Sequence, residues 1–579
     1  MSKKIANQLV DIIVEAGIKR IYAITGDSLN ELNNAVLKCP DIQWIHVRNE
    51  EAGAFAASAE AQLTGLACCA GSSGPGHVHL LNGLYDAHRS GASVLAIAST
   101  CATKEFGSGY LQETNIIKLF DDCSYYNQIA ATQAQLPRMA QAAIQTAIHK
   151  KGVSVVGLPG DLAGLPAVAI ESSTAVYRCK ASVTPDIAEI RQLAKLINSH
   201  PKICIYCGIG AAEAHDEVVE LAGKLKAPVG YSYRGKMGMQ YDNPYEVGMT
   251  GLLGLPSAYH SMHECDLVLL LGTDFPYTPF YPQNKKIIQI DIKPENLGRR
   301  TKLTMGLHGD IKSSVTELLP LVENKEDRSF LDAQLQIYKQ VRKHLNSYVI
   351  DKGKKGAIQP EAVAAELNKL ASEDAVFTCD TGMCNVWSAR YIIANGKRSL
   401  IGSFVHGSMA NAMPHAIGAA LACPERQVVA MCGDGGISML LGDLATIKQY
   451  NLPIKIIVFN NRALGMVKLE MEVLGLEDYQ IDMLNPDFKL IAEAMGIKGI
   501  TISDPEMMQA GLKEAFEHEG TVLVNVLTNP SALAMPPKIE LQMAEGMALS
   551  MTKMMLGGKL EDVLETVKTN YKHLPEVFD

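Results

Sequence analysis

The sequence predicts an α/β protein built on parallel sheets, because short apolar runs are repeatedly followed by a glycine turn and a helical pattern. Near the start of the chain these runs are Arg20–Gly26, Leu66–Gly71 and Val94–Ser99. The 579 residues exceed what one hydrophobic core usually supports, so we expect several such units. The composition, 47% hydrophobic and 20% charged with 48 glycines, is typical of a globular α/β protein.

Three Rossmann-like parallel-sheet domains and a helical tail are expected. The first domain covers residues 1–180, and a stretch from Ala163 to about Pro185 loses periodicity, as linkers do. The second covers residues 181–345 and contains the apolar runs Ile203–Gly208, Leu267–Gly272 and Lys286–Asp291. The third covers residues 346–530, and the tail covers residues 531–579.

Charge and cysteine usage exclude some classes of protein. A net charge of -9 argues against a nucleic-acid-binding protein, which normally carries a basic patch. The 13 cysteines are scattered and lie mostly in apolar runs, which is typical of reduced thiols in a cytosolic protein. No run approaches the ~20 apolar residues of a membrane-spanning helix. We therefore expect a cytoplasmic protein, with at most a peripheral attachment to the inner face of the cell membrane.

The strongest chemical signal lies in the third domain, where two apolar strands end in polar residues. Gly433-Asp434-Gly435-Gly436 follows the first strand, and Asn460-Asn461 follows the second. Because ligands bind at the carboxyl ends of parallel strands, Asp434 and Asn461 can offer hard oxygen ligands to Mg²⁺ beside a diphosphate. The glycines allow close backbone approach, and the next helix N-terminus favours anionic oxygens. A single Gly-Asp-Gly would indicate an ordinary turn, whereas the pair at two strand ends favours a cofactor site.

This pair of motifs resembles the signature of thiamine diphosphate-dependent decarboxylases and oxidases. The resemblance implies that Mg²⁺ is bound by Asp434, Asn461 and the backbone carbonyl of Ala463. It also implies contacts between the cofactor and a further set of residues: Gly435, Gly436, Arg462, Leu464, Gly465, Met466 and Val467.

The other end of this cofactor needs a carboxylate, because the aminopyrimidine is activated by a hydrogen bond to its ring nitrogen. Glu50 stands where a strand leads into a helix, and we expect it to serve as this proton-relay residue in a dry crevice. Glu51, by contrast, is typical of an acid that favours a helix N-terminus. Relatives usually have a histidine before this glutamate, whereas this chain has Asn49.

The segment Gly407-Ser408-Met409 is a further thiamine feature by resemblance. Met409 is expected to hold the cofactor in its bent shape, although alone it would indicate a core residue. Glu50 and the metal site lie in different domains, and in this superfamily the cofactor bridges two subunits. The resemblance therefore implies a homo-oligomer, with a tetramer favoured over a dimer.

The resemblance extends over nearly the whole chain, to bacterial pyruvate oxidases and quinone-linked pyruvate dehydrogenases. The segments that carry it are Thr25–Asn30, Gly74–Gly76, Gly107–Glu113 and Phe404–Met409. In this group the middle domain binds FAD, although in some decarboxylase relatives it has lost the flavin. The residues that match the flavin pattern are Arg234, Thr250, Gly251, Leu252, Leu253, Thr273, Asp274, Phe275, Pro276, Tyr277 and Asp291.

By position, Leu111, Thr381, Met466 and Glu470 are expected to line the substrate side and to include the catalytic groups beside Glu50. Relatives usually carry aromatic residues or Val where Leu111, Thr381 and Met466 stand, so the pocket is expected to be roomier. Pyruvate is the expected substrate, and slightly larger 2-oxo acids are a hypothesis.

The tail contains an apolar stripe at helical spacing, formed by Leu560, Val563, Leu564, Val567 and Tyr571. The common outcome for such a stripe is docking on the protein body. The resemblance implies instead that the tail detaches when the flavin is reduced and inserts into a phospholipid surface.

The resulting expectation is an oxidative decarboxylation of pyruvate to acetate and CO₂, with electrons passed to ubiquinone or menaquinone. Two alternatives stay open: a phosphate-dependent oxidase that makes acetyl phosphate and H₂O₂, and an acetolactate synthase. A non-enzymatic flavoprotein scaffold is a third, against which the intact set Glu50, Asp434 and Asn461 argues.

Overall fold

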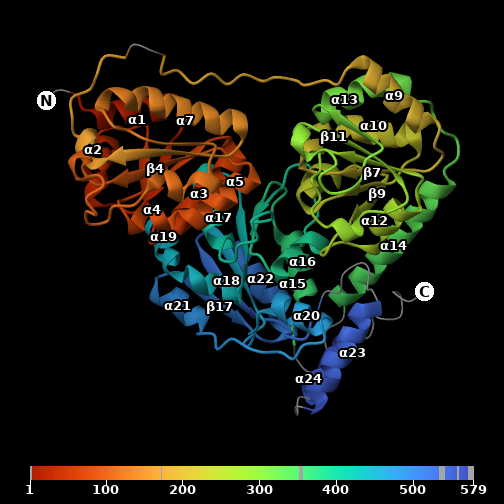
Figure 1. The fold of residues 1–579 in the computed structure, drawn as a ribbon. Coiled ribbons are helices and arrows are strands. Elements are labelled where there is room, and N and C mark those ends of the chain that lie inside the picture. Colours follow the sequence, from red (N-terminus) through yellow and green to blue (C-terminus); the bar gives the residue numbers. More distant parts are fainter. Residues whose placement is uncertain (1–2, 171–172, 351–356, 534–540, 557–559, 571–579) are drawn as a thin grey trace.

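The computed structural model describes residues 3–170, 173–350, 357–533, 541–556 and 560–570. Within these residues the chain forms three six-stranded parallel sheets packed between helices, arranged as three lobes (Figure 1). The sheets confirm the predicted α/β class. The segment between α8 (Gly160–Ala163) and α9 (Ile187–Asn198) runs from the first lobe to the second along the top of the view.

The first and third sheets share one topology. The first has the order β2-β1-β3-β4-β6-β5 and the third has the order β14-β13-β15-β16-β18-β17. The strands of the first are β1 (Arg20–Ala23), β2 (Gln43–His46), β3 (Ala67–Gly71), β4 (Val94–Thr100), β5 (Tyr126–Ile129) and β6 (Val153–Pro159). Those of the third are β13 (Val376–Cys379), β14 (Ser399–Gly402), β15 (Val428–Gly433), β16 (Ile454–Asn460), β17 (Lys498–Ile502) and β18 (Val522–Leu527).

The second sheet has a different order, β12-β11-β10-β7-β8-β9. Numbered from its own first strand this is 3-2-1-4-5-6, the order of dinucleotide-binding Rossmann domains. Its strands are β7 (Ile203–Cys207), β8 (Val229–Tyr231), β9 (Glu246–Met249), β10 (Leu267–Leu271), β11 (Lys286–Asp291) and β12 (Met305–His308). The strand order reverses between β7 and β10, which is where such sheets bind ligands.

Helices connect the strands in all three lobes. Those of the first lobe include α1 (Ile5–Glu15), α2 (Asn30–Leu37), α3 (Glu50–Thr64), α4 (Pro75–His79), α5 (Leu81–Ser90), α6 (Ile116–Leu119) and α7 (Leu136–Lys150). Those of the second include α10 (His215–Leu225), α11 (Lys236–Met239), α12 (Pro256–Glu264), α13 (Ile311–Leu318) and α14 (Ser329–Ile350). Those of the third include α15 (Pro360–Leu370), α16 (Met383–Tyr391), α17 (Ala412–Ala422), α18 (Asp434–Met439), α19 (Leu444–Gln449), α20 (Gly465–Val473), α21 (Phe488–Ala494) and α22 (Met508–Glu517).

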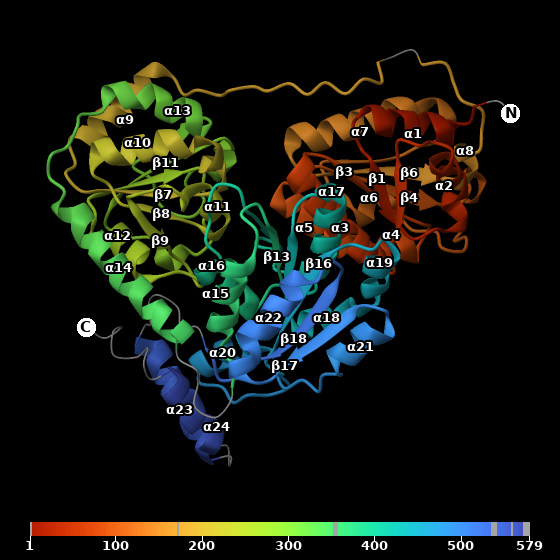
Figure 2. The same cartoon turned by 180° about the vertical axis from the view of Figure 1, so that it is seen from behind.

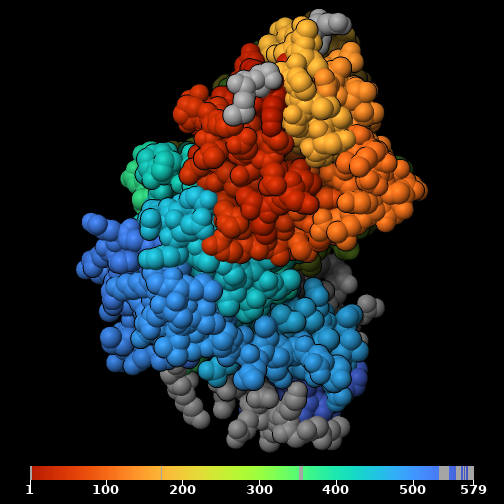
Figure 3. Space-filling model, turned by 90° about the vertical axis from the view of Figure 1, so that its left-hand side faces the viewer, coloured from red at the N-terminus to blue at the C-terminus, as the bar shows by residue number. Residues whose placement is uncertain are grey.

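The first and third lobes are joined by helices α3 and α17, which lie side by side (Figures 1 and 2). Their facing residues are mostly alanine and glycine, so the two backbones approach closely. A Cβ atom added at Gly418 would overlap the carbonyl oxygen of Ala56. One continuous core contains buried residues of both helices. Figure 3 shows the result, with the first lobe (red and orange) seated directly on the third (cyan and blue).

A buried polar cluster accompanies this contact. His415 of α17 and Asp86 of α5 lie 3.1 Å apart with no exposed side-chain surface, and Ser58 of α3 donates to the same Asp86 oxygen at 2.9 Å. Because a buried carboxylate is costly unless it is paired, these partners stabilise one relative placement of the two lobes.

The second lobe is tied to the third through Lys236 at the start of α11. Its ammonium group is fully buried and donates to the backbone carbonyls of Ser388 at 3.1 Å, Ala389 at 2.7 Å and Ile392. These carbonyls end helix α16, where a cation is favoured by the helix dipole. Burial lowers the pKa of Lys236 to about 7.

The tail forms two helices, α23 (Leu541–Leu556) and α24 (Leu560–Asn570). Helix α23 packs along α20: Ser550 donates to the carbonyl of Leu476 at 2.7 Å, and Lys553 donates to that of Gly475 at 2.9 Å. Helix α24 is anchored by Asn570, which donates to the carbonyl of Ser531 at 2.8 Å. Of the expected apolar stripe, Val563 is buried and Leu564 is 46% exposed, while Tyr571 lies outside the described residues. Of the helices in the described part of the chain, none combines the length and the apolar composition needed to cross a bilayer.

The contact between α3 and α17 yields a stability prediction. Gly418→Ala should destabilise the protein by about 1–3 kcal/mol, because the added methyl group overpacks the helix pair. The matched control is Gly442→Ala, where the new Cβ atom would meet only Arg48 Cβ at 3.8 Å. Thermal unfolding of both variants checks this, and equal midpoints would contradict the proposed role of the close contact.

Candidate functional site

The carboxyl edge of the third sheet brings Asp434 and Asn461 together. Asp434 begins α18 directly after β15, and Asn461 follows β16, the neighbouring strand. The Asp434 carboxylate is 3% exposed and accepts the backbone N–H of Arg462 at 2.7 Å and that of Gly435 at 2.9 Å. Burial raises the pKa of Asp434. Asn461 Oδ1 accepts the N–H of Ala463 at 3.1 Å, which holds the third expected metal ligand in the same turn.

Asn485 completes this edge, and the sequence reasoning missed it. Its amide donates to Asp434 Oδ2 at 2.7 Å and to Asn460 Oδ1 at 3.0 Å. Asn460 in turn donates to Asn525 of β18 at 2.9 Å. The carboxylate is therefore oriented by an amide network that spans two neighbouring strands. Asn485 follows no strand and belongs to no recognisable spacing, so only the fold reveals it.

Asp380 is a second buried carboxylate that the sequence reasoning did not single out. It directly follows β13, at the point between β13 and β15 where the strand order of the third sheet reverses. Its oxygens accept the N–H of Ala412 at 2.9 Å and that of Gly433 at 3.1 Å. Burial raises its pKa to about 6. A Cβ atom at Gly436 would overlap Asp380 Oδ2, so the last glycine of the motif is required by this contact.

Met409 lies against the glycine motif. Its terminal methyl carbon is 3.1 Å from the place that a Cβ atom of Gly435 would take. The segment reaches this place through two residues of left-handed conformation, Gly407 at φ 78° and Ala410 at φ 65°. The structure thus joins two expected thiamine features, which lie 26 residues apart, from Met409 to Gly435, in the sequence.

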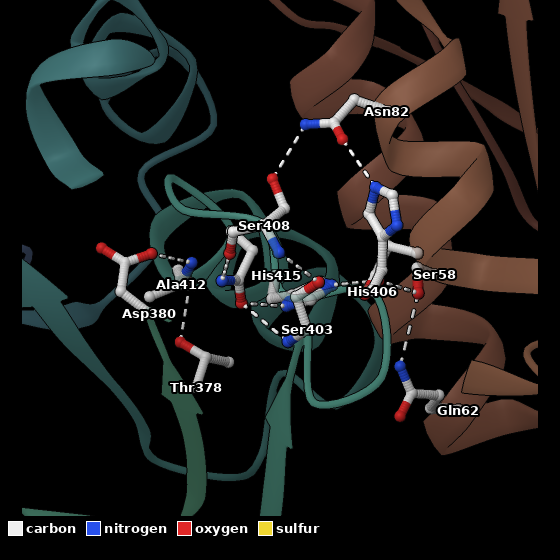
Figure 4. Close-up of polar contacts among 12 residues, drawn as sticks. Ser58, Gln62, Asn82, Thr378, Asp380, Ser403, His406, Ser408, Ala412 and His415 are labelled. Carbon is white, nitrogen blue, oxygen red and sulfur yellow. Dashed lines mark hydrogen bonds and ion pairs between the residues drawn. The ribbon is translucent and has the colours of Figure 1, made fainter. Parts of the chain in front are cut away.

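The Met409 segment is fastened to the first lobe by Asn82 of α5, as Figure 4 shows. The Asn82 amide donates to Ser408 Oγ at 2.8 Å and to Glu51 Oε1 at 2.8 Å, and its carbonyl oxygen lies 2.8 Å from His406 Nε2. Asn82 therefore links the start of α3 to the loop that carries Met409, and no sequence pattern had identified it.

Glu50 is the first residue of α3 and is 4% exposed. His79 Nδ1 lies 3.1 Å from its Oε2, which is the one hydrogen bond of this carboxylate within the described residues. Gly76 stands beside Oε1, where a Cβ atom would lie at 3.2 Å. Asn49, the residue that departs from the usual histidine, caps α3 by accepting the N–H of Glu51 at 2.9 Å. Oε1 is thus left open to a donor or acceptor from outside the chain.

The residues expected on the substrate side do not form one cluster. Leu111 is 78% exposed on the first lobe, whereas Thr381 lies before α16 and Met466 and Glu470 lie on α20 of the third lobe. Thr381 Oγ1 is buried without a hydrogen-bond partner. Within the described residues, no hydrogen bond or ion pair joins Glu50 to Asp434 or Asn461.

In the second lobe, the expected flavin residues lie at or after the carboxyl ends of β8, β9, β10 and β11. Thr250 is 4% exposed and its hydroxyl has no hydrogen-bond partner, next to Gly251 at φ 103°. Asp291 is 4% exposed at the end of β11, and burial raises its pKa.

Other members of the flavin set have protein partners. Asp274 forms ion pairs with Arg299 and with Arg300, the latter at 3.0 Å. Arg234 donates to the carbonyl of Ser90 in the first lobe at 2.6 Å. Phe275 is 3% exposed and packs in an aromatic cluster with Tyr206, Tyr277 and Tyr281.

The polar atoms at these edges fit the groups that the sequence implies, which are Mg²⁺ with thiamine diphosphate in the third lobe and FAD in the second. One carboxylate with an amide and a carbonyl oxygen is a suitable set for Mg²⁺ when phosphate oxygens complete the coordination. Consistent with so few carboxylates, the described residues contain no group of three or more His, Cys, Asp and Glu side chains that could hold a metal by themselves. The unpartnered hydroxyls of Thr381 and Thr250 stand at the two expected cofactor edges.

Three family models match the chain. The N-terminal TPP binding domain of thiamine pyrophosphate enzymes matches residues 3–119, the central domain residues 190–318 and the C-terminal TPP binding domain residues 380–526.

Similar proteins extend this match to nearly the full length. YdaP of Bacillus subtilis, described provisionally as thiamine pyrophosphate-containing, is 36% identical over 96% of both chains. Pyruvate oxidase of Lactiplantibacillus plantarum is 32% identical over 91% of this chain and 89% of that one. The acetolactate synthase large subunit of Porphyra purpurea is 28% identical over 89% of this chain and 90% of that one. The chain therefore belongs to the thiamine diphosphate-dependent enzymes of the pyruvate oxidase and acetolactate synthase family.

Proposed function

We propose that this enzyme decarboxylates pyruvate oxidatively to acetate and CO₂, using thiamine diphosphate, Mg²⁺ and FAD, and passes the electrons to a membrane quinone. Pyruvate and one water give acetate, CO₂, two protons and two electrons. The observation that supports the quinone-linked assignment is a tail with exposed apolar side chains, whose helix α23 packs on α20, the helix that holds Met466 and Glu470. A tail in this place couples the substrate side of the site to a segment that can bind a lipid surface.

The thiamine site follows from the contacts of the third lobe. When bound, thiamine diphosphate supplies an electron sink for decarboxylation. Asp434, Asn461 and the Ala463 carbonyl would hold Mg²⁺, and Met409 would support the cofactor beside Gly435. Glu50 would hold a proton at Oε1, the oxygen that Gly76 leaves accessible. Because Glu50 has no bond to the metal-binding residues, the site is expected to be completed by a second copy of the chain, in a dimer or tetramer.

The flavin assignment is supported by the second lobe. Its strand order is that of dinucleotide-binding domains, and the unpartnered Thr250 hydroxyl lies at the expected edge. Asp291 at the end of β11 suits a ribose hydroxyl. Bound FAD would supply the two-electron acceptor. In the acetolactate synthase alternative the same lobe would bind FAD without net oxidation. The strand order alone therefore does not distinguish the oxidative reaction from the synthase reaction.

The membrane assignment is supported by exposed apolar residues on the tail. Leu549, Met555 and Leu564 are 50%, 43% and 46% exposed. Both tail helices are held to the body by a few polar bonds, of which Ser550, Lys553 and Asn570 contribute three. We propose that reduction of the flavin releases the tail, which then attaches the enzyme to the inner face of the cell membrane.

The reaction is tested anaerobically. Pyruvate added with thiamine diphosphate and Mg²⁺ should bleach the flavin absorbance, and the product should be acetate at one equivalent per flavin. Glu50→Gln should abolish bleaching, while Glu51→Gln should retain it because a glutamine oxygen can still accept from Asn82. Acetolactate with unbleached flavin would assign a synthase, and acetyl phosphate formed only with phosphate and oxygen would assign an oxidase. Neither result is compatible with the quinone-linked reaction.

The metal assignment predicts that Asp434→Asn weakens Mg²⁺ binding by about tenfold or more, because the single anionic ligand is lost. Titration of Mg²⁺ in the presence of thiamine diphosphate, followed by protein fluorescence, measures this. Asp504→Asn, an exposed helix cap in the same lobe, is the control. Equal affinities in the two variants would remove Asp434 from the metal site.

The tail assignment predicts the effect of truncation. Deleting residues 557–579 should abolish activation by phospholipid vesicles, because the lipid-binding segment is lost, while ferricyanide-coupled activity persists. Vesicle co-sedimentation with and without pyruvate measures the attachment. Lipid activation that survives the deletion would refute the assignment.

A further inference from the structure

The loop formed by residues 103–113, here called the Glu113 loop, is held by a carboxylate and not by a core. Phe106, Tyr110 and Leu111 are 39%, 50% and 78% exposed, so apolar burial contributes little to its shape. Two glycines, Gly107 at φ 79° and Gly109 at φ 73°, turn the backbone. A segment of this kind is expected to be mobile unless polar contacts restrain it.

The Glu113 side chain supplies those contacts. Its Oε1 accepts the N–H of Gly107 at 2.6 Å, and its Oε2 accepts the N–H of Gly109 at 2.9 Å and that of Tyr110 at 3.2 Å. The backbone N–H of Glu113 donates to the carbonyl of Tyr110 at 2.9 Å, which closes the turn. Charge-assisted bonds to three converging amides form a strong local clamp.

The ends of the loop are anchored on the first lobe. Thr103 donates to Asp161 through its hydroxyl at 2.7 Å and through its backbone N–H at 3.1 Å. Ser73 donates to the carbonyl of Gln112 at 2.9 Å, and His77 is hydrogen-bonded to Thr114. Both Ser73 and His77 flank the Gly74–Gly76 turn that stands beside Glu50. Because both ends of the loop are anchored, the contacts of the Glu113 carboxylate are what restrain its tip.

The loop borders a cavity at the carboxyl edge of the first sheet. This cavity has a volume of about 240 Å³ and is lined by Asp27, Cys101, Lys104 and Tyr110 among others. Leu111, expected on the substrate side, follows Tyr110 directly. The orientation of the loop therefore determines how Tyr110 and Leu111 face this edge.

We propose that Glu113 is a positioning residue, which fixes Tyr110 and Leu111 at the substrate side by binding the amides of Gly107, Gly109 and Tyr110. The inference rests on the proposed function for the identity of the 2-oxo acid, but its structural part does not. The hydrogen bond from Gly107 lowers the pKa of Glu113, with further lowering from Gly109 and Tyr110. A carboxylate of lowered pKa stabilises the loop above its ordinary pKa, and this stabilisation is lost as the pH falls through the lowered value. The clamp is thus fully formed at neutral pH.

The test compares Glu113→Gln and Glu113→Ala with Asp121→Asn, an exposed acid of the same lobe, in the full-length holoenzyme. Amide hydrogen exchange at pH 7 should show faster exchange in the peptide containing residues 106–110 for both Glu113 variants. The KM for pyruvate should rise about tenfold in Glu113→Ala and less in Glu113→Gln, which keeps one acceptor oxygen. The kcat, the affinity for thiamine diphosphate and the unfolding temperature should change little, and Asp121→Asn should match the wild type.

Unchanged exchange in the Glu113 variants would overturn the clamp. Faster exchange with an unchanged KM would overturn the positioning role. If Glu113→Ala does not fold, Glu113→Gln carries both measurements. If the wild type fails to turn over pyruvate, the proposed function fails while the exchange result still decides the clamp, and KM is then measured with the 2-oxo acid that is turned over.

Discussion

The close contact of α3 with α17 is the constraint on which the rest of the site depends. Each helix begins at a functional segment: α3 at Glu50, and α17 just after Met409. Because alanine and glycine let the backbones meet, and because His415 and Ser58 both contact Oδ2 of the buried Asp86 inside the contact, the two helices have one stable register. Asn82 then fastens the Met409 segment to the start of α3. The position of Glu50 relative to the Met409 segment of the same chain is therefore set by how these two helices pack.

The topology of the sheets explains why polar residues occur where they do. In the first and third sheets the strand order reverses beside the first strand, between β1 and β3 and between β13 and β15. Glu50 follows β2, the edge strand of the first sheet, whereas two buried carboxylates of the third sheet lie at its reversal. In the third sheet Asp380 follows one strand of the pair and Asp434 follows the other. Neighbouring parallel strands with diverging connections leave backbone N–H groups at their carboxyl ends, and these groups receive the two carboxylates. In the middle sheet, Thr250 follows the edge strand β9 and Asp291 ends β11, so both lie at the carboxyl edge of the sheet but not at the reversal between β7 and β10.

The second lobe and the tail each contact helices of the third lobe. Lys236 binds the carbonyls at the carboxyl end of α16, whose other end begins after Thr381, and so fixes this helix. Helix α23 lies along α20, which carries Met466 and Glu470. A displacement of either partner would be transmitted to residues near the expected substrate, since these helices are short and begin at the site. Both contacts therefore reach helices that carry residues expected at the substrate side.

The sequence by itself determined the α/β class and the candidate site residues that belong to short motifs of consecutive residues. Asp434, Asn461 and Met409 could be predicted because strand ends, glycine turns and short motifs are written in consecutive residues. Asn82, Asp380 and Asn485 could not, since each acts on a partner distant in the chain, and no short pattern marks a residue whose role is to orient another. Asn49 illustrates the same limit. The sequence shows that it differs from the histidine of relatives, but only the fold shows that it caps a helix. What only the tertiary structure decided is which of these side chains meet, because that depends on how closely α3 and α17 pack.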